Sequence, residues 1–516
     1  MSLTPQTYWL EHALLGPSRA GGGAGPGPAA ATPGPGRSGP GPAAAGPDPG
    51  HAEPGLSRVE SGVVVETGAD GRVTGVRTGV TDPPTGAVSL PGLTVPGLAN
   101  AHSHAFHRAL RGTVQAGAAR AGVLREARAG NAAAADEAAQ AGGRAPDSFW
   151  TWREVMYAVA DRLTPENYFF LARAVYAEMA LAGITCVGEF HYVHHAPGGI
   201  RYDDPNAMGE ALIEAAAEAG IRITLLDTAY LSAGFGRPPT VPQLRFSDGT
   251  ADRWAERAAA LTDRPHARIG AAIHSVRAVP AAQLSTVARW AADRGAPLHV
   301  HLSEQTAEND ACLAAHGCTP TRLLADHGAL GPRTTAVHAT HLTAEDIELL
   351  GGSGTGVCMC PTTERDLADG IGPAVRVQGA GSPLSLGSDS HAVIDLFEEA
   401  RAMELDERLR TRTRGHWTAA QLLRAATADG HAALGWDAAG RLETGALADF
   451  TTITLSSVRT AGPPPRLAAE TAVFAATGAD VRHTVVGGRH IVRDGRHQLV
   501  PDVPKALSET IDALRG

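Results

Sequence analysis

The feature that most constrains this chain is a set of four apolar segments that each end abruptly in a histidine or an aspartate. The first leads into His102 and His104, which are separated by one residue. Because alternate side chains of a strand share one face, this pair should offer two imidazoles to the same metal ion. The later segments lead to His301, His338 and Asp389. Such groups on four strand ends predict a transition-metal site.

The composition favours a large protein that handles small molecules. With 516 residues and 43% hydrophobic content, the chain can bury a large core and should hold more than one structural unit. A net charge of −10 and an isoelectric point near 6.1 argue against a nucleic-acid or anionic-membrane surface. We expect no transmembrane helix and no signal peptide. Five cysteines without framework spacing favour a reduced, cytoplasmic protein.

The order of the elements predicts two structural units. Turn-punctuated β patterns occur in residues 1–92 and again in residues 438–516, which end in a helix, so both chain ends should build one small β-rich domain. Residues 93–437 alternate strands with Ala-rich helical stretches, among them 164–182, 205–219, 280–294 and 394–408. The eight expected strands end near His104, Tyr192, Tyr230, Ser275, Glu304, Ala339, Pro361 and Asp389. This pattern predicts an α/β protein with a (β/α)8 barrel rather than an open doubly wound sheet.

Two segments of low complexity interrupt this order. Residues 16–54 consist almost entirely of Gly, Pro, Ala and Ser, and residues 116–144 are dominated by Ala, Gly and Arg. Neither can bury much apolar surface, so we interpret both as disordered loops. The second follows the first barrel strand, on the side where barrel active sites lie, and a lid is the alternative interpretation there.

Metal catalysis requires a site that leaves one ligand position open for water. Three histidines at strand ends can supply neutral nitrogens: His102, His104 and His301. Asp389 can coordinate the metal and can also accept a proton from that water. Glu304 lies just beyond a strand end, where it can deliver a proton to the leaving group. His338, on the next strand, could stabilise charge that develops at the attacked carbon.

Other histidines and two cysteines offer alternatives. His299 alternates with His301 on one strand, and the register decides between them; we prefer His301, which is nearer the strand end. On the next strand we prefer His338 to His341, which should cap or pack the following helix. The remaining candidates are interpreted as loop histidines or buried strand thiols: His194, His195, His391, Cys358 and Cys360.

The sequence around these residues resembles one superfamily of metal-dependent hydrolases. Four segments are similar to motifs of the amidohydrolase superfamily: PGLANAHSH, HVHLSE, AVHATH and LGSDSH. Within this superfamily, the glutamate of HLSE marks the branch that deaminates C=N–NH2 groups. Binuclear members carry a bridging lysine where this chain has none, which implies a single ion, Zn2+ or alternatively Fe2+. A closer resemblance, to the formimidoylglutamate deiminases, rests on SFWTWR at 148–153, GEFHYVHH at 188–195, IHSVR at 273–277 and HVHLSEQ at 299–305.

The resemblance implies a reaction and a substrate pocket. These enzymes convert N-formimidoyl-L-glutamate and water to N-formyl-L-glutamate and ammonia in histidine degradation, and we expect the chain to act as a homodimer. A substrate with two carboxylates needs fixed donors, and arginine forks bind carboxylates in a bidentate manner. The residues that could supply them are Arg153, Tyr192, His274 and Arg277. His107 stands where the family has glutamine, and it could still hydrogen-bond the substrate.

Two rival functions stay open. A purine or triazine aminohydrolase, such as a guanine deaminase, would share the metal ligands but would need aromatic stacking, and aromatic residues make up only 5% of the chain. A metal-free scaffold on the same fold would have lost ligands that this chain retains. An assay of ammonia release from formimidoylglutamate and from guanine separates these hypotheses.

Overall fold

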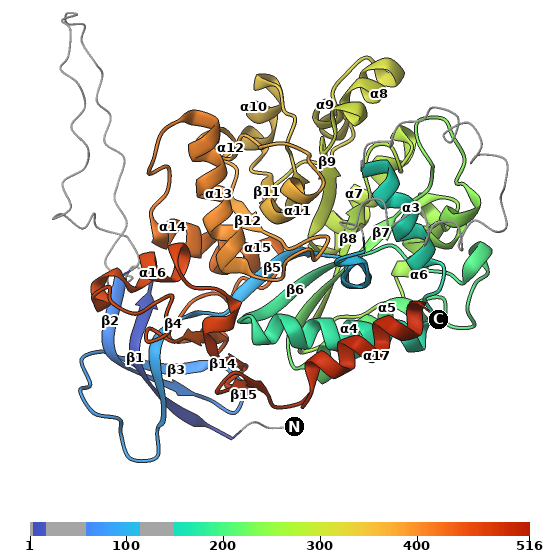
Figure 1. Ribbon diagram of the computed structural model, residues 1–516. Helices are drawn as coiled ribbons and strands as arrows, with labels where there is room; N and C mark the ends of the chain where they lie inside the picture. The colour runs from blue at the N-terminus through green and yellow to red at the C-terminus, as the bar shows by residue number, and fades with distance from the viewer. Residues whose placement is uncertain (1–3, 17–57, 114–148, 516) are drawn as a thin grey trace, which may run out of the picture.

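The computed structural model describes residues 4–16, 58–113 and 149–515. These residues form two eight-stranded sheets, one closed into a barrel and one open (Figure 1). Apart from Gly16, the two segments interpreted as disordered loops, 16–54 and 116–144, lie outside the described residues. In the part of the chain that is described, no helix is both long enough and apolar enough to span a bilayer.

Eight parallel strands form the barrel and pair in chain order. They are β5 (Leu98–Ser103), β6 (Ile184–His191), β7 (Arg222–Ala229), β8 (Ala267–Ile273), β9 (Leu298–Leu302), β10 (Thr334–His338), β11 (Gly356–Met359) and β12 (Leu384–Leu386). A parallel bridge between Ser103 and Asp389 joins the last strand end to the first. The (β/α)8 barrel is therefore confirmed, and each strand ends within three residues of its expected position.

Helices follow most of these strands and cover the outside of the barrel (Figure 1). They are α3 (Phe149–Ala160), α4 (Pro165–Leu181), α5 (Ala207–Ala219), α6 (Ala251–Ala258), α7 (Ala281–Arg294), α8 (Thr306–His316), α9 (Pro320–Asp326), α10 (Ala344–Ser353), α11 (Pro361–Asp366), α12 (Ala374–Gly379), α13 (Leu396–Thr411), α14 (Ala419–Arg424) and α15 (Gly430–Ala433). Both β6 and β7 are buried along their whole length, as parallel strands covered on both faces should be. α4 begins with a capping box between Thr164 and Asn167, which explains its sharp start.

Strands from both ends of the chain build the second sheet (Figure 1). The strand order is β16-β15-β14-β13-β4-β1-β2-β3. They are β1 (Gln6–Leu15), β2 (Arg58–Thr67), β3 (Val73–Arg77), β4 (Val88–Pro96), β13 (Phe450–Ile453), β14 (Val481–Val486), β15 (Arg489–Arg493) and β16 (Arg496–His497). β4 pairs in parallel with β1 and antiparallel with β13, so it joins the two halves. The β-rich domain built from both chain ends is confirmed.

The two units are connected with almost no linker. β4 continues past residue 92, where the sequence analysis places the domain boundary, and only Gly97 separates it from β5. After the barrel, α16 (Ala468–Phe474) lies between β13 and β14 in the chain. The chain ends in α17 (Val503–Arg515), which packs against α4 of the barrel (Figure 1).

Candidate active site and metal centre

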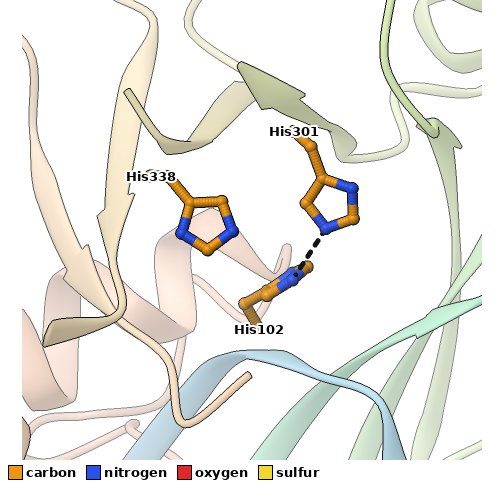
Figure 2. A group of neighbouring side chains, drawn as sticks. All are labelled: His102, His301 and His338. Atoms are coloured by element: carbon orange, nitrogen blue, oxygen red, sulfur yellow. Dashed lines mark hydrogen bonds between the residues drawn. The ribbon is translucent and has the colours of Figure 1, made fainter. Parts of the chain in front are cut away.

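The four expected metal ligands lie together at the carboxyl ends of the barrel strands. His102 lies in β5 with His104 directly after it, His301 lies in β9, and Asp389 follows β12. Asp389 Oδ1 is 3.2 Å from His102 Nε2 and 3.4 Å from His104 Nε2. The Nε2 atoms of His102 and His301 are 3.0 Å apart, and Figure 2 shows their rings facing the same space. Side chains from three strand ends thus converge on one point.

The orientations of the His104 and His301 rings leave their lone pairs pointing inward. In each ring, Nδ1 lies 2.9 Å from a backbone carbonyl oxygen. Because a carbonyl only accepts, each Nδ1 carries the hydrogen and each Nε2 keeps a lone pair. These lone pairs face the Asp389 carboxylate, which also only accepts, and the ring nitrogen of His102. Acceptors gather in this way around a cation, so the residues fit a divalent metal ion.

The electrostatics of the cluster maintain the protonation states that bind metals. Burial, followed by the neighbouring His102, lowers the pKa of His104 to about 3, and burial lowers the pKa of His301 well below its ordinary value. Burial acts to raise the pKa of Asp389, but the hydrogen bond and charge of His102 hold it well below its ordinary value. Neutral imidazoles and an ionised carboxylate are the forms that coordinate a divalent ion.

His338 and Glu304 lie next to the four ligands. His338 Nε2 is 3.8 Å from Asp389 Oδ2 and 3.8 Å from Glu304 Oε1, and its ring faces those of His102 and His301 in Figure 2. Burial raises the pKa of Glu304. Burial acts to lower the pKa of His338, but Glu304 and the other nearby carboxylates raise it well above its ordinary value. A carboxyl group with a raised pKa beside the expected metal ligands has the property that a general acid needs.

Two buried glutamates that the sequence analysis missed hold the site histidines. Glu364, in α11, accepts a hydrogen bond from His338 Nδ1 at 3.4 Å. Glu189, near the end of β6, accepts from the Ser103 hydroxyl at 2.8 Å and from the backbone N–H of Ala105 at 2.7 Å. Burial raises the pKa of Glu189 to about 7. These contacts fix the His338 ring and the backbone on both sides of His104.

Left-handed backbone conformations gather at the same strand ends. The φ angles are 49° at Ser303, 68° at His338, 51° at Ala339, 42° at Asp389 and 58° at His391. Residues other than glycine adopt this region at a cost, and they keep it only where the surrounding structure imposes it. Such residues are typical of binding and catalytic sites, so the backbone supports the assignment that the side chains suggest.

A cavity beside the cluster is lined by every residue that the sequence analysis assigns to the substrate. These are His107, Arg153, Tyr192, His274 and Arg277. His104, His301, Glu304, His338 and Asp389 line the same cavity. Trp152, Met156 and Leu367 also line it, and the sequence analysis missed all three. Ligands and substrate residues therefore share one space, while the role of each residue stays a prediction.

Fixed partners position the two arginines of this cavity. Arg153 Nη2 donates to the Tyr230 hydroxyl at 2.8 Å. Arg277 Nε lies 3.6 Å from Oε2 of Glu308, which is buried in α8. Burial raises the pKa of Glu308 to about 7. Both guanidinium groups are therefore held near the cavity wall before any substrate arrives, which reduces the entropy lost on binding.

The sequence model of the amidohydrolase family matches residues 93–491, which include the whole barrel. The chain belongs to the amidohydrolase family. It is therefore a hydrolase that acts on carbon–nitrogen bonds.

The relatives of this amidohydrolase include a deiminase and a deaminase. A formimidoylglutamate deiminase from Pseudomonas aeruginosa is 36% identical over 422 residues, which cover 80% of this chain and 87% of the relative. An 8-oxoguanine deaminase from the same organism is 33% identical over 352 residues, which cover 67% of this chain and 76% of the relative. The crystal structure of an amidohydrolase from Brucella melitensis matches with a TM-score of 0.79 and 28% identity, over 99% of this chain and 100% of that chain. The resemblance to the formimidoylglutamate deiminases is confirmed.

The histidines and cysteines weighed as alternatives to the expected metal ligands have other surroundings in this amidohydrolase. His299 Nε2 is 2.9 Å from a backbone carbonyl, two residues back along β9 from His301. His341 lies outside the strands, and its backbone N–H donates to the backbone carbonyl of Ser303. His391, also outside the strands, is buried between two serine hydroxyls at 3.0 Å. Cys358 and Cys360 are buried, and burial raises the pKa of the Cys360 thiol well above its ordinary value.

His194 and His195 belong to a buried ionic network whose residues do not line the cavity. Asp248 Oδ1 is 3.1 Å from His195 Nε2. Arg257, in α6, donates to both carboxylate oxygens of Asp227, at 2.8 and 2.9 Å, and to Asp248. Although His191, His194 and Asp227 are close enough to hold a metal ion, Arg257 already neutralises that carboxylate. We interpret this network as structural.

Arg257→Met should destabilise the fold by about 3–5 kcal/mol, because Asp227 and Asp248 would remain buried without a cation. Denaturant unfolding monitored by circular dichroism measures this loss. Arg322→Met is the matched control: its pair with Asp326 is about half exposed, and its removal should cost less than about 1 kcal/mol. Equal, small losses in the two variants would contradict the structural role of Arg257.

Proposed function

We propose that this amidohydrolase converts N-formimidoyl-L-glutamate and water to N-formyl-L-glutamate and ammonia. The observation that carries this proposal is the composition of the cavity wall. One part of the wall consists of metal ligands and Glu304, and another includes Arg153 and Arg277. A substrate with a reactive C=N group and two carboxylates needs both, because arginine matches carboxylate geometry. The similarity to a formimidoylglutamate deiminase supports the same substrate.

We propose one Zn2+ per chain, held by His102, His104, His301 and Asp389, with Fe2+ as the alternative. Three imidazoles and a carboxylate suit either ion. A second ion bridged by a modified lysine has no support, since the only lysine of the chain is Lys505, in the C-terminal helix α17. When bound, the metal would act as a Lewis acid and lower the pKa of water to about 7.

The side chains of the site divide the proton transfers between them. Amidines are strong bases, so the formimidoyl group arrives as a planar cation. As water attacks its carbon, the Asp389 carboxylate accepts a proton from that water. Glu304 protonates the terminal nitrogen, and the C–N bond to that nitrogen breaks. The hydroxyl proton on the attacked carbon passes to the Glu304 carboxylate as the formyl C=O forms, and the proton held by Asp389 leaves with ammonia as ammonium. The second C–N bond survives in N-formyl-L-glutamate. His338, held by Glu364, donates toward the oxygen on the attacked carbon.

Arg277 provides a direct test of the dicarboxylate pocket. Arg277→Ala should lower kcat/KM for formimidoylglutamate by about 10- to 100-fold, because a charged hydrogen bond contributes roughly 1.5–3 kcal/mol. Arg277→Lys should recover only part of the loss, since a point charge cannot reproduce the guanidinium fork. Metal content should not change in either variant. A kcat/KM of Arg277→Ala equal to that of the wild type would contradict the proposed binding of the substrate carboxylates by Arg277.

The second candidate function is deamination of a purine. It is favoured by the 33% identity to an 8-oxoguanine deaminase and by the aromatic rings of Trp152 and Tyr192 in the cavity wall. Ammonia release measured side by side on formimidoylglutamate, guanine and 8-oxoguanine separates the two functions. We expect the protein to release ammonia from formimidoylglutamate alone. A preference for either purine would contradict this expectation and favour purine deamination as the function.

The cellular setting is also part of the proposal. We propose that the protein acts in the cytoplasm, in histidine degradation, as a homodimer. Light scattering of the purified protein tests the homodimer, and a mass of one chain would contradict it.

A further inference from the structure

Asp369 is a buried carboxylate beside the site that the proposed mechanism does not use. It lies in the turn between α11 and α12, and its N–H donates to the carbonyl of Glu364 at 2.9 Å. The neighbours Ala368 and Gly370 have φ angles of 59° and 116°, so the chain turns sharply on both sides. The residue is only 5% exposed. This turn carries the Asp369 side chain into the protein, toward Glu304 and His338.

The Asp369 carboxylate lacks a full set of partners. Its Oδ1 accepts a hydrogen bond from the Gln305 side chain. Its Oδ2 has no hydrogen-bond partner among the described residues. One carboxylate oxygen of Asp369 lies within 4.8 Å of a carboxylate oxygen of Glu304 and of a ring nitrogen of His338. A buried oxygen without a partner is costly and is typical of a group that awaits a ligand.

The charges around Asp369 indicate which ligand is missing. Two carboxylates this close repel each other in a buried site, and burial, followed by the charge of Glu304, raises the pKa of Asp369. His338 is the ring that faces both carboxylates, and Arg277, which lines the cavity, already faces Glu308. A planar cation with several N–H groups, placed between the carboxylates, would satisfy both of them.

We propose that Asp369 binds the amidinium end of the substrate, its free carboxylate oxygen accepting an N–H of the terminal nitrogen that leaves as ammonia. This inference rests on the proposed function and extends it to specificity. Glu304 faces the same nitrogen and supplies its proton, whereas Asp369 orients the cation. The site then selects a substrate that is cationic at its reactive end and anionic at its far end. A purine amino group has no formal charge and gains less from Asp369.

Asp369→Asn tests this role, because it keeps the shape of the side chain and an acceptor for Gln305 but removes the charge. We expect kcat/KM for formimidoylglutamate to fall about 10- to 100-fold, as for the loss of a charged hydrogen bond. Inhibition by N-formyl-L-glutamate should change by less than about twofold. That product keeps both carboxylates and the shape of the substrate but ends in a neutral formyl group. The matched control is Asp366→Asn, which changes an exposed aspartate in the same segment. It should leave both kcat/KM and the inhibition by N-formyl-L-glutamate unchanged.

The contrast between cationic substrate and neutral product decides the outcome. If Asp369→Asn lowered kcat/KM for formimidoylglutamate and weakened inhibition by N-formyl-L-glutamate equally, the role of Asp369 would be structural and the inference would be overturned. Unchanged kcat/KM in the Asp369→Asn variant would overturn it as well. If wild type bound two metal ions and Asp369→Asn lost one, Asp369 would be a metal ligand and the inference would also fall. Failure of the proposed function is recognised separately: the wild-type protein would then not release ammonia from formimidoylglutamate at all.

Discussion

Glu304→Gln should lower kcat for formimidoylglutamate by at least about 100-fold, the usual size of general acid–base catalysis. Glutamine matches the shape of glutamate but has no proton to give, and Glu304 is the buried carboxyl group with a raised pKa that lines the cavity beside the metal ligands. KM and metal content should stay close to the wild-type values. Steady-state kinetics with metal analysis of the same preparation measures all three.

The control for this variant is Glu345→Gln, which removes an exposed carboxylate at the start of α10 and should change nothing. Two results would contradict the role of Glu304. If Glu304→Gln lost the metal, the residue would be a ligand. If it kept full kcat, another group would supply the proton.

His301→Ala should remove the metal and lower turnover by at least about 1,000-fold, because the pKa of water would return from about 7 toward its bulk value of about 15.7. Elemental analysis should find one ion per chain in the wild-type protein and none in the variant. His299→Gln is the matched control, since His299 lies on the same strand but bonds a backbone carbonyl. It should retain the metal. Metal retained in His301→Ala, or lost only in His299→Gln, would reverse the assignment of these two histidines.

The barrel could be predicted closely because its strand ends are marked in the sequence. Most of the buried apolar runs stop at a polar residue, such as His104 after β5 or Glu304 after β9, and Ala-rich helices separate many of the runs. The pairing within the β-rich domain could not be predicted in the same way. Short alternating strands do not specify their partners, and β4 finds β1 on one side and β13, more than 350 residues later, on the other.

The expected metal ligands and Arg277 could be named from sequence because they lie at strand ends or within a few residues after them. Arg153 lies in helix α3 instead, and it was named from the SFWTWR motif of the resemblance. Glu189 was also detectable, since it ends an apolar run in β6 as the ligands do, but a lone glutamate gives no spacing pattern. Glu364 and Asp369 were harder to find. They lie in the segment after β11, and they reach the site only because that chain folds back toward His338. Such contacts depend on tertiary structure, which local patterns do not report.

The most direct test of the central claim follows the products of formimidoylglutamate in isotopically labelled water. We expect N-formyl-L-glutamate with one labelled oxygen in its formyl group, and one ammonia for each molecule formed. The reaction should disappear in His301→Ala. Glutamate and formamide as products would show that the other C–N bond breaks, and would contradict the assignment of hydrolytic deimination to this site.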